Sequence, residues 1–477
     1  MHRIFIAFLI FVTGNVLAQV HTKDFKRRIV IQDLDDPWEV TFGPDSNLWV
    51  TESKSYLVKK INPETGKSTL LLDLSNERKF ARFDTLKEPK APWPQGGLMG
   101  LALHPEFQHN KKFVYLCYVA HLNSVNSLGG AKYTGKLVRY QYNSQSEKLE
   151  NPMVICDTLP QSNDHNSGRL AVGKLAGKYF LYLTVGDGGA GQYSNAGQPN
   201  YAQDKEHYSG KVLRFHLEPD NDAGDYNRWI PNDNPFNEQE KQNAVWTYGH
   251  RNAQGIAFAE IGRKEFLYAS EHGPYGDDEL NLIIKGKNYG HPNIIGYNDN
   301  NYNSFAGAVS DNKNLPLPWH TTLPTINEER SAAQFGDTFQ EPEKVFKVIS
   351  AEMLETVFSK SFKDAPYVPE TSALAPSSLA IYTADAIPGW QNSLLIPSLK
   401  EGKLVRLQIG TDLKVEKEET NYFEAEVRYR DVAISTDGKK IYLSTDNSKA
   451  SSGPSKENPQ DTNCTGCIIE YKYEGNQ

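Results

Sequence analysis

Short apolar runs recur along the chain and are separated by turns rich in glycine, proline, aspartate and asparagine. In each copy of this pattern an apolar run is followed by a turn and then by a second apolar run, usually rich in aromatic residues. Runs of β-branched and aromatic residues favour strands, and the residues between them favour turns. Each copy therefore predicts a β-hairpin, and the six copies lie at 40–52, 101–116, 170–183, 256–271, 379–397 and 432–444.

A more polar strand follows several of these hairpins, for example at 57–62 and 211–215. Units of roughly four strands that repeat along one chain are typical of a propeller. The sequence thus predicts an all-β fold, a six-bladed β-propeller with four-stranded antiparallel blades. A large irregular β-sandwich is the alternative, but the repetition of one pattern and the near absence of long helical periodicity favour the propeller.

No segment has the composition of a linker between domains, so we expect a single propeller domain over 19–477. The segment 300–378 is far longer than a hairpin connection requires, and the proline-rich stretch 87–95 is a similar candidate for a rim loop. Loops on a rigid scaffold of this kind often carry function.

The N-terminus has the features of a secretory signal peptide. Arg3 supplies a positive charge, 4–12 is wholly apolar, and 16–18 is a small-residue cleavage site. We expect a signal peptide at 1–18, with cleavage before Gln19. The apolar run is too short to span a bilayer comfortably, so the sequence predicts an exported protein, periplasmic or secreted, with no membrane anchor.

The charge balance limits the partners. Arg3 is the only Lys, Arg, Asp or Glu in 1–18, so cleavage would change the formal net charge from −8 to −9. An acidic chain is a poor partner for nucleic acid or for an anionic membrane surface, both of which attract basic faces. We therefore expect no nucleic acid and no membrane partner.

The four cysteines give a weaker signal. Cys117 and Cys156 lie far apart in sequence, whereas Cys464 and Cys467 form one Cys-x-x-Cys pair near the C-terminus. A single pair is weak evidence for zinc. A disulfide clip in an exported chain and a pair of free thiols both remain open.

The stretch Asp164-His165-Asn166-Ser167-Gly168-Arg169 is the clearest candidate for chemistry. An imidazole titrates near neutrality and is well suited to take a proton from an alcohol. The adjacent carboxylate of Asp164 can hold the ring or the substrate. A solvated loop histidine is the alternative.

Cationic residues stand at equivalent places in several repeats. Arg428 and Arg430 alternate on a predicted strand and would share a face, and Arg251 and Lys400 lie beside other hairpins. Equivalent positions of a propeller face the same central channel, so these four cations are predicted to meet around one small polyanion. Four unrelated surface charges are the alternative.

An acidic turn follows the fourth hairpin. Asp277, Asp278 and Glu279 come directly after Gly273-Pro274-Tyr275-Gly276, and the carbonyl oxygens of Gly273 and Pro274 are plausible further donors. Calcium takes six to eight oxygen ligands of these kinds. The spacing is not that of an EF-hand, and an acidic surface turn is the alternative.

These motifs together resemble the soluble quinoprotein glucose dehydrogenases, six-bladed propellers that use pyrroloquinoline quinone (PQQ). The similarity covers most of the mature chain, and several motifs occur in the same order. They are QGGLMG at 95–100 with His104 and Pro105, DHNSGR at 164–169, GKVLR at 210–214, GHRN at 249–252, the block 273–293, PSLK at 397–400 and RYRD at 428–431.

The resemblance implies oxidation of an aldose at its anomeric carbon to the lactone. His165 would be the general base, and a hydride would pass to the quinone. Gln95 and Asp164 would hold the sugar. The cofactor, which has three carboxylates, would be held by Arg251, Asn252, Lys400, Arg428 and Arg430.

The resemblance also implies calcium. An ion on the Gly273 and Pro274 carbonyls would polarise the quinone. Further ions would use Asp278, Glu279 and the Tyr289 carbonyl in one site, and Tyr297, Asp299 and Glu328 in another. In this family such calcium binding accompanies homodimer formation. A small sugar substrate and a small or protein electron acceptor would be the other partners.

Two features depart from the family. His272 stands where the family usually has glutamine, and 367–374 does not match the family's aromatic, cysteine-bearing loop.

Two other functions remain as alternatives. A calcium-dependent sugar-lactone hydrolase would have side-chain metal ligands around its axis and no cationic cluster. A non-catalytic carbohydrate-binding propeller would have no use for His165 together with four cations.

Overall fold

The strands form six four-stranded antiparallel sheets, which confirms the predicted six-bladed β-propeller. The structure is a computed structural model that describes residues 20–82, 92–220, 227–238, 241–310, 313–315, 318–361, 373–446, 464 and 466–475. The predicted signal peptide 1–18, positions 87–91 of the proline-rich stretch and positions 367–372 of the unmatched loop lie outside these residues, so export stays a prediction.

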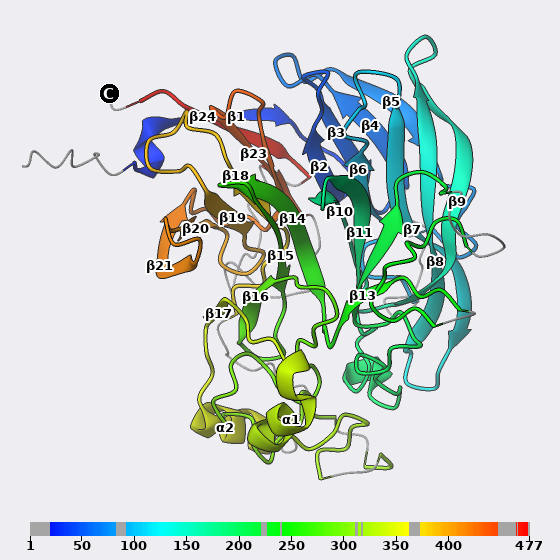
Figure 1. Cartoon of the computed structure of the whole chain (residues 1–477), viewed down its shortest axis with the longest axis vertical. Coiled ribbons are helices and arrows are strands. Elements are labelled where there is room, and N and C mark those ends of the chain that lie inside the picture. Colours follow the sequence, from blue (N-terminus) through cyan, green and yellow to red (C-terminus); the bar gives the residue numbers. More distant parts are fainter. Residues whose placement is uncertain are drawn as a thin grey trace, which may run out of the picture.

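Each predicted hairpin forms the first two strands of one blade. Figure 1 shows the strands in chain order. The first blade contains β2 (Pro37–Phe42), β3 (Leu48–Glu52), β4 (Leu57–Ile61) and β5 (Ser68–Asp73), and the second contains β6 (Leu98–Leu103), β7 (Phe113–Val125), β8 (Ala131–Asn143) and β9 (Lys148–Ser162). The third contains β10 (Ser167–Leu175), β11 (Lys178–Val185), β12 (Lys211–His216) and β13 (Val245–Tyr248), and the fourth contains β14 (Ala253–Ile261), β15 (Lys264–Glu271), β16 (Asp278–Leu282) and β17 (Lys344–Phe346). The fifth contains β18 (Ala380–Tyr382), β19 (Ser393–Pro397), β20 (Leu404–Ile409) and β21 (Val415–Tyr422).

The sixth blade joins the two ends of the chain. It contains β22 (Tyr429–Ile434), β23 (Lys440–Thr445) and β24 (Ile468–Tyr473), and its outer strand is β1 (Phe25–Ile31). β1 runs antiparallel to β24, with Phe25 opposite Tyr473, and Arg28 forms an ion pair with Glu470 at 2.9 Å. The ring of blades is therefore closed by hydrogen bonds between the first and last strands.

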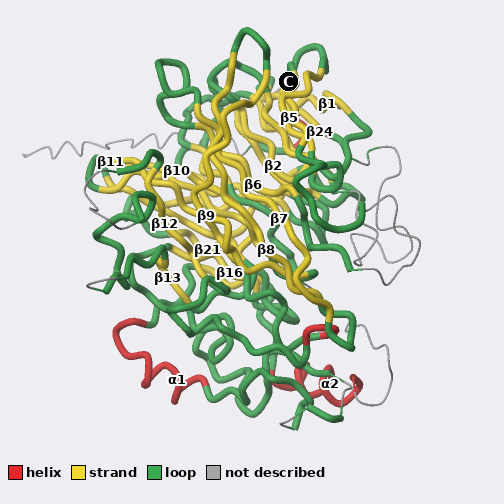
Figure 2. Tube along the Cα trace, turned by 90° about the vertical axis from the view of Figure 1, so that its right-hand side faces the viewer, coloured by secondary structure: helices red, strands yellow, loops and turns green. Residues whose placement is uncertain are grey.

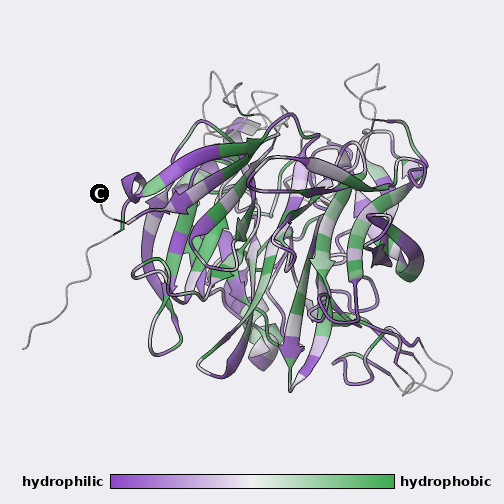
Figure 3. Ribbon diagram, turned by 90° about the horizontal axis from the view of Figure 1, so that it is seen from above, coloured by the Kyte–Doolittle hydropathy of each residue, from purple (hydrophilic) through white to green (hydrophobic). Residues whose placement is uncertain are grey.

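Apolar side chains pack between neighbouring blades. One cluster joins Trp49 and Val58 of the first blade to Leu116 and Val138 of the second. In Figure 3 apolar and polar stretches alternate along the strands, as expected where each sheet buries its faces against its neighbours.

Two long connections form a small helical layer at one end of the sheets (Figure 2). The first joins β16 to β17 within the fourth blade and contains α1 (Glu328–Phe335), and the second joins β17 to the fifth blade and contains α2 (Ala351–Ser361). Tyr302 of the first connection packs with Leu354 and Phe358 of α2 in a satellite core. The short 3-10 turns are η1 (Thr22–Asp24), η3 (Tyr193–Asn195) and η4 (Gly336–Thr338). In the part of the chain described here, no helix combines the length and apolarity needed to cross a membrane.

Arg169 of β10 connects four other blades at the axis. Its Nε donates to Gln254 O at 2.9 Å, and its Nη2 donates to Ser377 O at 3.0 Å. Its Nη1 lies 2.7 Å from Glu39 Oε2 and 3.2 Å from Asp431 Oδ2. Only a side chain near the axis can reach the first, fourth, fifth and sixth blades from the third.

The two carboxylates around Arg169 make stability depend on pH. Burial raises the pKa of Glu39 from 4.5 to about 7, against the opposing charge of Arg169 and with the repulsion of Asp431. The folded state therefore holds a proton that the unfolded state releases, and this stabilisation is lost as pH rises from about 4.5 through about 7. We expect Glu39→Gln to reduce the difference between the free energies of unfolding at about pH 5 and about pH 8, both measured by urea unfolding. The same pH dependence in both proteins would contradict the assignment.

Candidate active site

His165 lies in the turn between β9 and β10 and is buried. Its backbone is left-handed, with φ of 46°. Its Nδ1 lies 2.7 Å from Asp187 Oδ1, and its Nε2 lies 3.0 Å from Gln192 Nε2. A carboxylate only accepts, so Nδ1 carries the proton and Nε2 is left as the acceptor. His165 is thus arranged to take a proton at Nε2.

Asp187, which the sequence analysis missed, orients this imidazole. It follows β11 and also accepts from Gly189 N at 2.8 Å, from Asn200 Nδ2 at 3.0 Å and from His291 Nε2 at 2.9 Å. Burial alone would raise the pKa of Asp187, but the charges and hydrogen bonds of His165 and His291 hold it well below its usual value. Its place in the glycine-rich turn 186–191, directly after a predicted strand, was the available signal.

Gln95 and Asp164, the two predicted substrate residues, lie together beside His165. Gln95 Nε2 donates to Asp164 Oδ1 at 3.2 Å, and Gln192 Nε2 donates to Asp164 Oδ2 at 2.7 Å. Asp164 Oδ1 is 3.8 Å from His165 Nε2. Acceptors and donors for a sugar hydroxyl therefore surround the proton-accepting nitrogen.

Three of the four predicted cations, Lys400, Arg428 and Arg430, are neighbours of one another. Arg428 and Arg430 both contact Asp446, the first at 3.7 Å, and Arg430 donates to Gln254 Oε1 at 2.7 Å. Burial lowers the pKa of Lys400. The negative charge of Asp278 opposes this shift and the positive charge of Arg428 adds to it, so Lys400 lies near both residues.

Arg251 approaches His165 from the fourth blade. Its Nη2 donates to Gln192 Oε1 at 2.9 Å, and its Nη1 donates to the carbonyls of His272 and Gly273 at 3.1 and 3.0 Å. All three acceptors are neutral. Burial and then the charges of Arg251, His165 and Arg430 lower the pKa of His272 well below its usual value. The three acceptors of Arg251 leave its charge uncompensated, so its guanidinium fits an anionic group.

Two buried donors at this cluster lack a hydrogen-bond partner among the described residues. They are Asn252 Nδ2 and Arg428 Nε. Asn252 Oδ1, in contrast, accepts from Ser167 N and Ser167 Oγ, both at 3.2 Å. Because buried donors are rarely left unpaired, these two atoms fit a ligand with several acceptors.

The predicted calcium residues divide into separate groups. Both Asp278 oxygens accept from backbone, from Gly273 N at 3.0 Å and Ala375 N at 2.8 Å. Glu279 instead accepts from Gly296 N and Asn281 Nδ2, both at 2.9 Å. Asp278 and Glu279 are adjacent on β16, and neighbouring side chains of a strand point to opposite faces. Their carboxylates therefore have different surroundings.

Asp299 and Glu328 lie near each other and near Asp277. The pKa of Glu328 is raised to about 7 and that of Asp277 to about 8, mainly by burial and also by the negative charge of Asp299. Asp277 Oδ1 and Glu328 Oε1 are buried and have no hydrogen-bond partner in the described ranges. Crowded carboxylates of this kind fit a hard cation.

The two predicted tyrosine ligands can contribute only backbone oxygens. The Tyr289 hydroxyl accepts from Ile284 N, and its ring stacks on His250 at 4.5 Å. The Tyr297 hydroxyl accepts from Val345 N at 3.2 Å. Across the residues that the structure covers, no three His, Cys, Asp or Glu side chains could hold a metal ion by themselves. Any calcium site here depends on carbonyl oxygens.

The model of the glucose/sorbosone dehydrogenase family matches residues 34–343 and 350–452. The chain belongs to this family. Quinoprotein glucose dehydrogenase B of Acinetobacter calcoaceticus is 31% identical over 496 residues, which cover 97% of this chain and 94% of the relative. Aldose sugar dehydrogenase YliI of Escherichia coli is 26% identical over 424 residues, or 88% and 90% of the two chains.

Solved structures of this fold agree with the propeller. The PQQ-bound form of aldose sugar dehydrogenase from Streptomyces coelicolor superposes with a TM-score of 0.59 at 22% identity. The match covers 94% of this chain and 98% of that chain.

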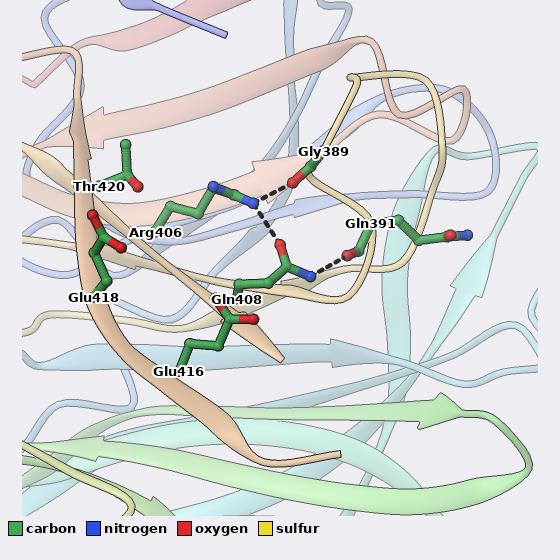
Figure 4. Close-up of a pocket in the computed structure, with 7 residues that line it drawn as sticks. All are labelled: Gly389, Gln391, Arg406, Gln408, Glu416, Glu418 and Thr420. Atoms are coloured by element: carbon green, nitrogen blue, oxygen red, sulfur yellow. Dashed lines mark hydrogen bonds between the residues drawn. The ribbon is translucent and has the colours of Figure 1, made fainter. Parts of the chain in front are cut away.

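This glucose/sorbosone dehydrogenase family member also has a polar groove of about 500 Å³ on the fifth blade (Figure 4). Arg406 crosses its floor and is already bonded to Ser393 Oγ, at 2.8 Å, and to Gly389 O and Gln408 Oε1. The rim contains Glu416 and Glu418. None of the residues around His165 lines the groove, so it is distinct from the candidate active site.

Proposed function

We propose that this protein oxidises an aldose at its anomeric carbon to the lactone, with PQQ as the electron acceptor and calcium as a second cofactor. The observation that carries the proposal is the oriented His165–Asp187 pair, with Arg251 held on Gln192 beside it and with Lys400, Arg428 and Arg430 clustered together. The activities named for the two sequence relatives support the same reaction class.

The residues of the chain would divide the work as follows. Asp164 and Gln95 bind and orient the anomeric hydroxyl, and His165 Nε2 takes its proton. Asp187 stabilises the imidazolium that forms, because its ionised carboxylate stays in contact with Nδ1. Burial of the pair excludes water from the proton-accepting atom.

The cofactor would be held by cations and amides. Arg251, Lys400, Arg428 and Arg430 offer charge for three carboxylates, and Asn252 Nδ2 and Arg428 Nε are donors with no partner among the described residues. When bound, PQQ would accept the hydride at a carbonyl carbon that calcium makes more electrophilic. The Gly273 and Pro274 carbonyls would hold that calcium. We further propose that Asp299 and Glu328, together with the Tyr297 carbonyl and with Asp277 nearby, hold a second ion.

Reconstitution of the purified protein tests the proposal. Apoprotein is loaded with PQQ and calcium and is then given a panel of aldoses with an artificial electron acceptor. We expect dye reduction that depends on both cofactors. If PQQ does not bind and no sugar reduces the dye, the proposal is wrong. Lactone hydrolysis without quinone would support the hydrolase alternative, and sugar binding without turnover would support a carbohydrate-binding propeller.

Asp187→Asn is expected to lower kcat on the order of a hundredfold. An asparagine cannot stabilise the imidazolium and can present its amide group to Nδ1, which would turn the ring or change its tautomer. The readout is the pH profile of kcat, which we expect to shift together with the loss of rate. A loss of rate at unchanged pH dependence would indicate only a structural role.

Export and assembly stay proposals as well. We propose that the chain is exported after cleavage before Gln19, that it forms a homodimer through the helical layer that contains Glu328, and that a small or protein acceptor reoxidises the cofactor. Mass determination of the mature protein and its sedimentation with and without calcium would test the first two points.

A further inference from the structure

His291 is a buried histidine that contacts the carboxylate behind the candidate base. It lies in the connection between β16 and β17. Its Nε2 is 2.9 Å from Asp187 Oδ2, whereas His165 Nδ1 is 2.7 Å from the other oxygen, Oδ1. A carboxylate only accepts, so each imidazole carries a proton on the nitrogen that faces Asp187. The two rings thus share one carboxylate.

Asp187 has two further donors, so four N–H groups surround its carboxylate. Gly189 N donates to Oδ1 at 2.8 Å, and Asn200 Nδ2 donates to Oδ2 at 3.0 Å. Asn200 Nδ2 also lies 3.1 Å from His291 Nε2, as expected for two donors on one oxygen. Hydrogen bonds to a carboxylate stabilise its charge and leave less of that charge for each partner. The contact with His291 therefore limits how strongly Asp187 stabilises the protonated form of His165.

Backbone contacts hold His291 and Asp187 in place. Gln203 Nε2 donates to His291 O at 2.7 Å, and His291 N donates to Gly249 O at 3.0 Å. Asp187 N donates to Arg251 O at 2.8 Å. Gly249 and Arg251 lie in the short turn between β13 and β14, so one segment fixes the spacing between the carboxylate and the second imidazole.

Other charged groups also face the two imidazoles. The titratable and charged groups close enough to interact with one ring or the other are Asp164, Asp187, Arg251, Glu271 and His272. Among the described residues, Asp187 is the member of this set that is hydrogen-bonded to both rings. A change at His291 therefore reaches His165 through Asp187.

We propose that His291 is a positioning residue for the base: its N–H holds Asp187 Oδ2 and keeps His165 Nε2 unprotonated at lower pH. The inference rests on the proposed function, in which His165 takes a proton from a sugar hydroxyl. A base works best when it is unprotonated at the working pH and still strong enough to accept a proton. A carboxylate bonded only to His165 would stabilise the imidazolium more strongly and leave less of the base available. The role holds for either charge of the His291 ring, since Nε2 carries a proton in both.

The first test follows the His165 imidazole by NMR in the full chain with isotope-labelled histidine and without cofactor. We expect His291→Phe to raise the titration midpoint of His165 by about one pH unit. His291→Gln should leave it close to that of wild type, because a glutamine amide can donate to Asp187 from the same place. Asn200→Ala should raise it by less, because an amide is a weaker donor than an imidazole. His104→Phe, which removes a buried histidine of the second blade, should not change it.

The second test is the pH profile of kcat/KM in the reconstituted enzyme. The acid limb should move up by the same amount in His291→Phe and stay in place in His291→Gln. The NMR readout needs no turnover, so a raised midpoint in a protein that oxidises no sugar would support the positioning role and reject the proposed function. An unchanged or lowered midpoint in His291→Phe, or in Asn200→Ala should His291→Phe fail to fold, would overturn the role. Equal shifts in His291→Phe and His291→Gln would also overturn it, because they would show an effect of packing alone.

Discussion

Replacing His165 by alanine is expected to lower kcat of the reconstituted enzyme about a thousandfold while PQQ affinity stays close to that of wild type. General-base catalysis contributes on the order of 10²–10⁴ in rate. His165 Nε2 is the ring nitrogen that carries no proton, and no other described imidazole has both an ionised orienting partner and the Asp164–Gln95 pair beside it. The measurement is single-turnover reduction together with a fluorescence titration of PQQ.

The control for this prediction is His207→Ala. His207 also contacts a carboxylate, Asp204 at 2.9 Å, but it is exposed. It should change neither rate nor affinity. Loss of PQQ binding in His165→Ala with normal residual turnover would show that His165 belongs to the cofactor site and is not the base.

Arg169→Met is expected to have the largest effect on stability, about 3–5 kcal/mol of the free energy of unfolding. Methionine fills a similar volume, but it leaves Glu39 and Asp431 as buried carboxylates without their shared cation. It also leaves the carbonyls of Gln254 and Ser377 without their donor. Unfolding in guanidinium chloride at neutral pH measures the loss.

Two further variants define the origin of that effect. Arg330→Met on the exposed surface of α1 should change the free energy of unfolding by less than about 0.5 kcal/mol. Adding Glu39→Gln to Arg169→Met should recover part of the loss, because it removes a buried carboxyl group that has lost its cation. A loss below about 1 kcal/mol in Arg169→Met alone would mean that the axial contacts contribute little.

The blades could be predicted because their signals are local. Each hairpin is marked by an apolar run, a turn and a second run within about twenty residues, which is the range over which strand and turn propensities act. The pairing of β1 with β24 has no local signal, since Phe25 and Tyr473 lie at opposite ends of the chain. Arg169 looked like the end of a polar loop, and only the closed ring shows that it contacts four other blades.

The cationic part of the candidate site could be predicted because the repeats show which positions of different blades are equivalent. The four predicted cations flank three of the hairpins, and the structure brings Lys400, Arg428 and Arg430 close to one another. Asp187 and Gln192 were missed because glycine-rich turns have no periodicity from which side-chain directions can be inferred. The calcium sets were taken from the family resemblance, and they stay predictions; the carboxylates of Asp278 and Glu279, adjacent on β16, have different hydrogen-bond partners.

The closure of the sixth blade also sets the order in which the molecule can be completed. The first strand emerges at the start of synthesis, but its partner β24 is made almost last, so the ring stays open until the chain is nearly finished. Contacts this distant in sequence carry the highest loop-closure entropy and form slowly. Until then the strand edges that become β1 and β24 are unpaired and can join other chains. Truncation from either end would therefore remove the β1–β24 pairing and favour association between copies rather than a smaller propeller.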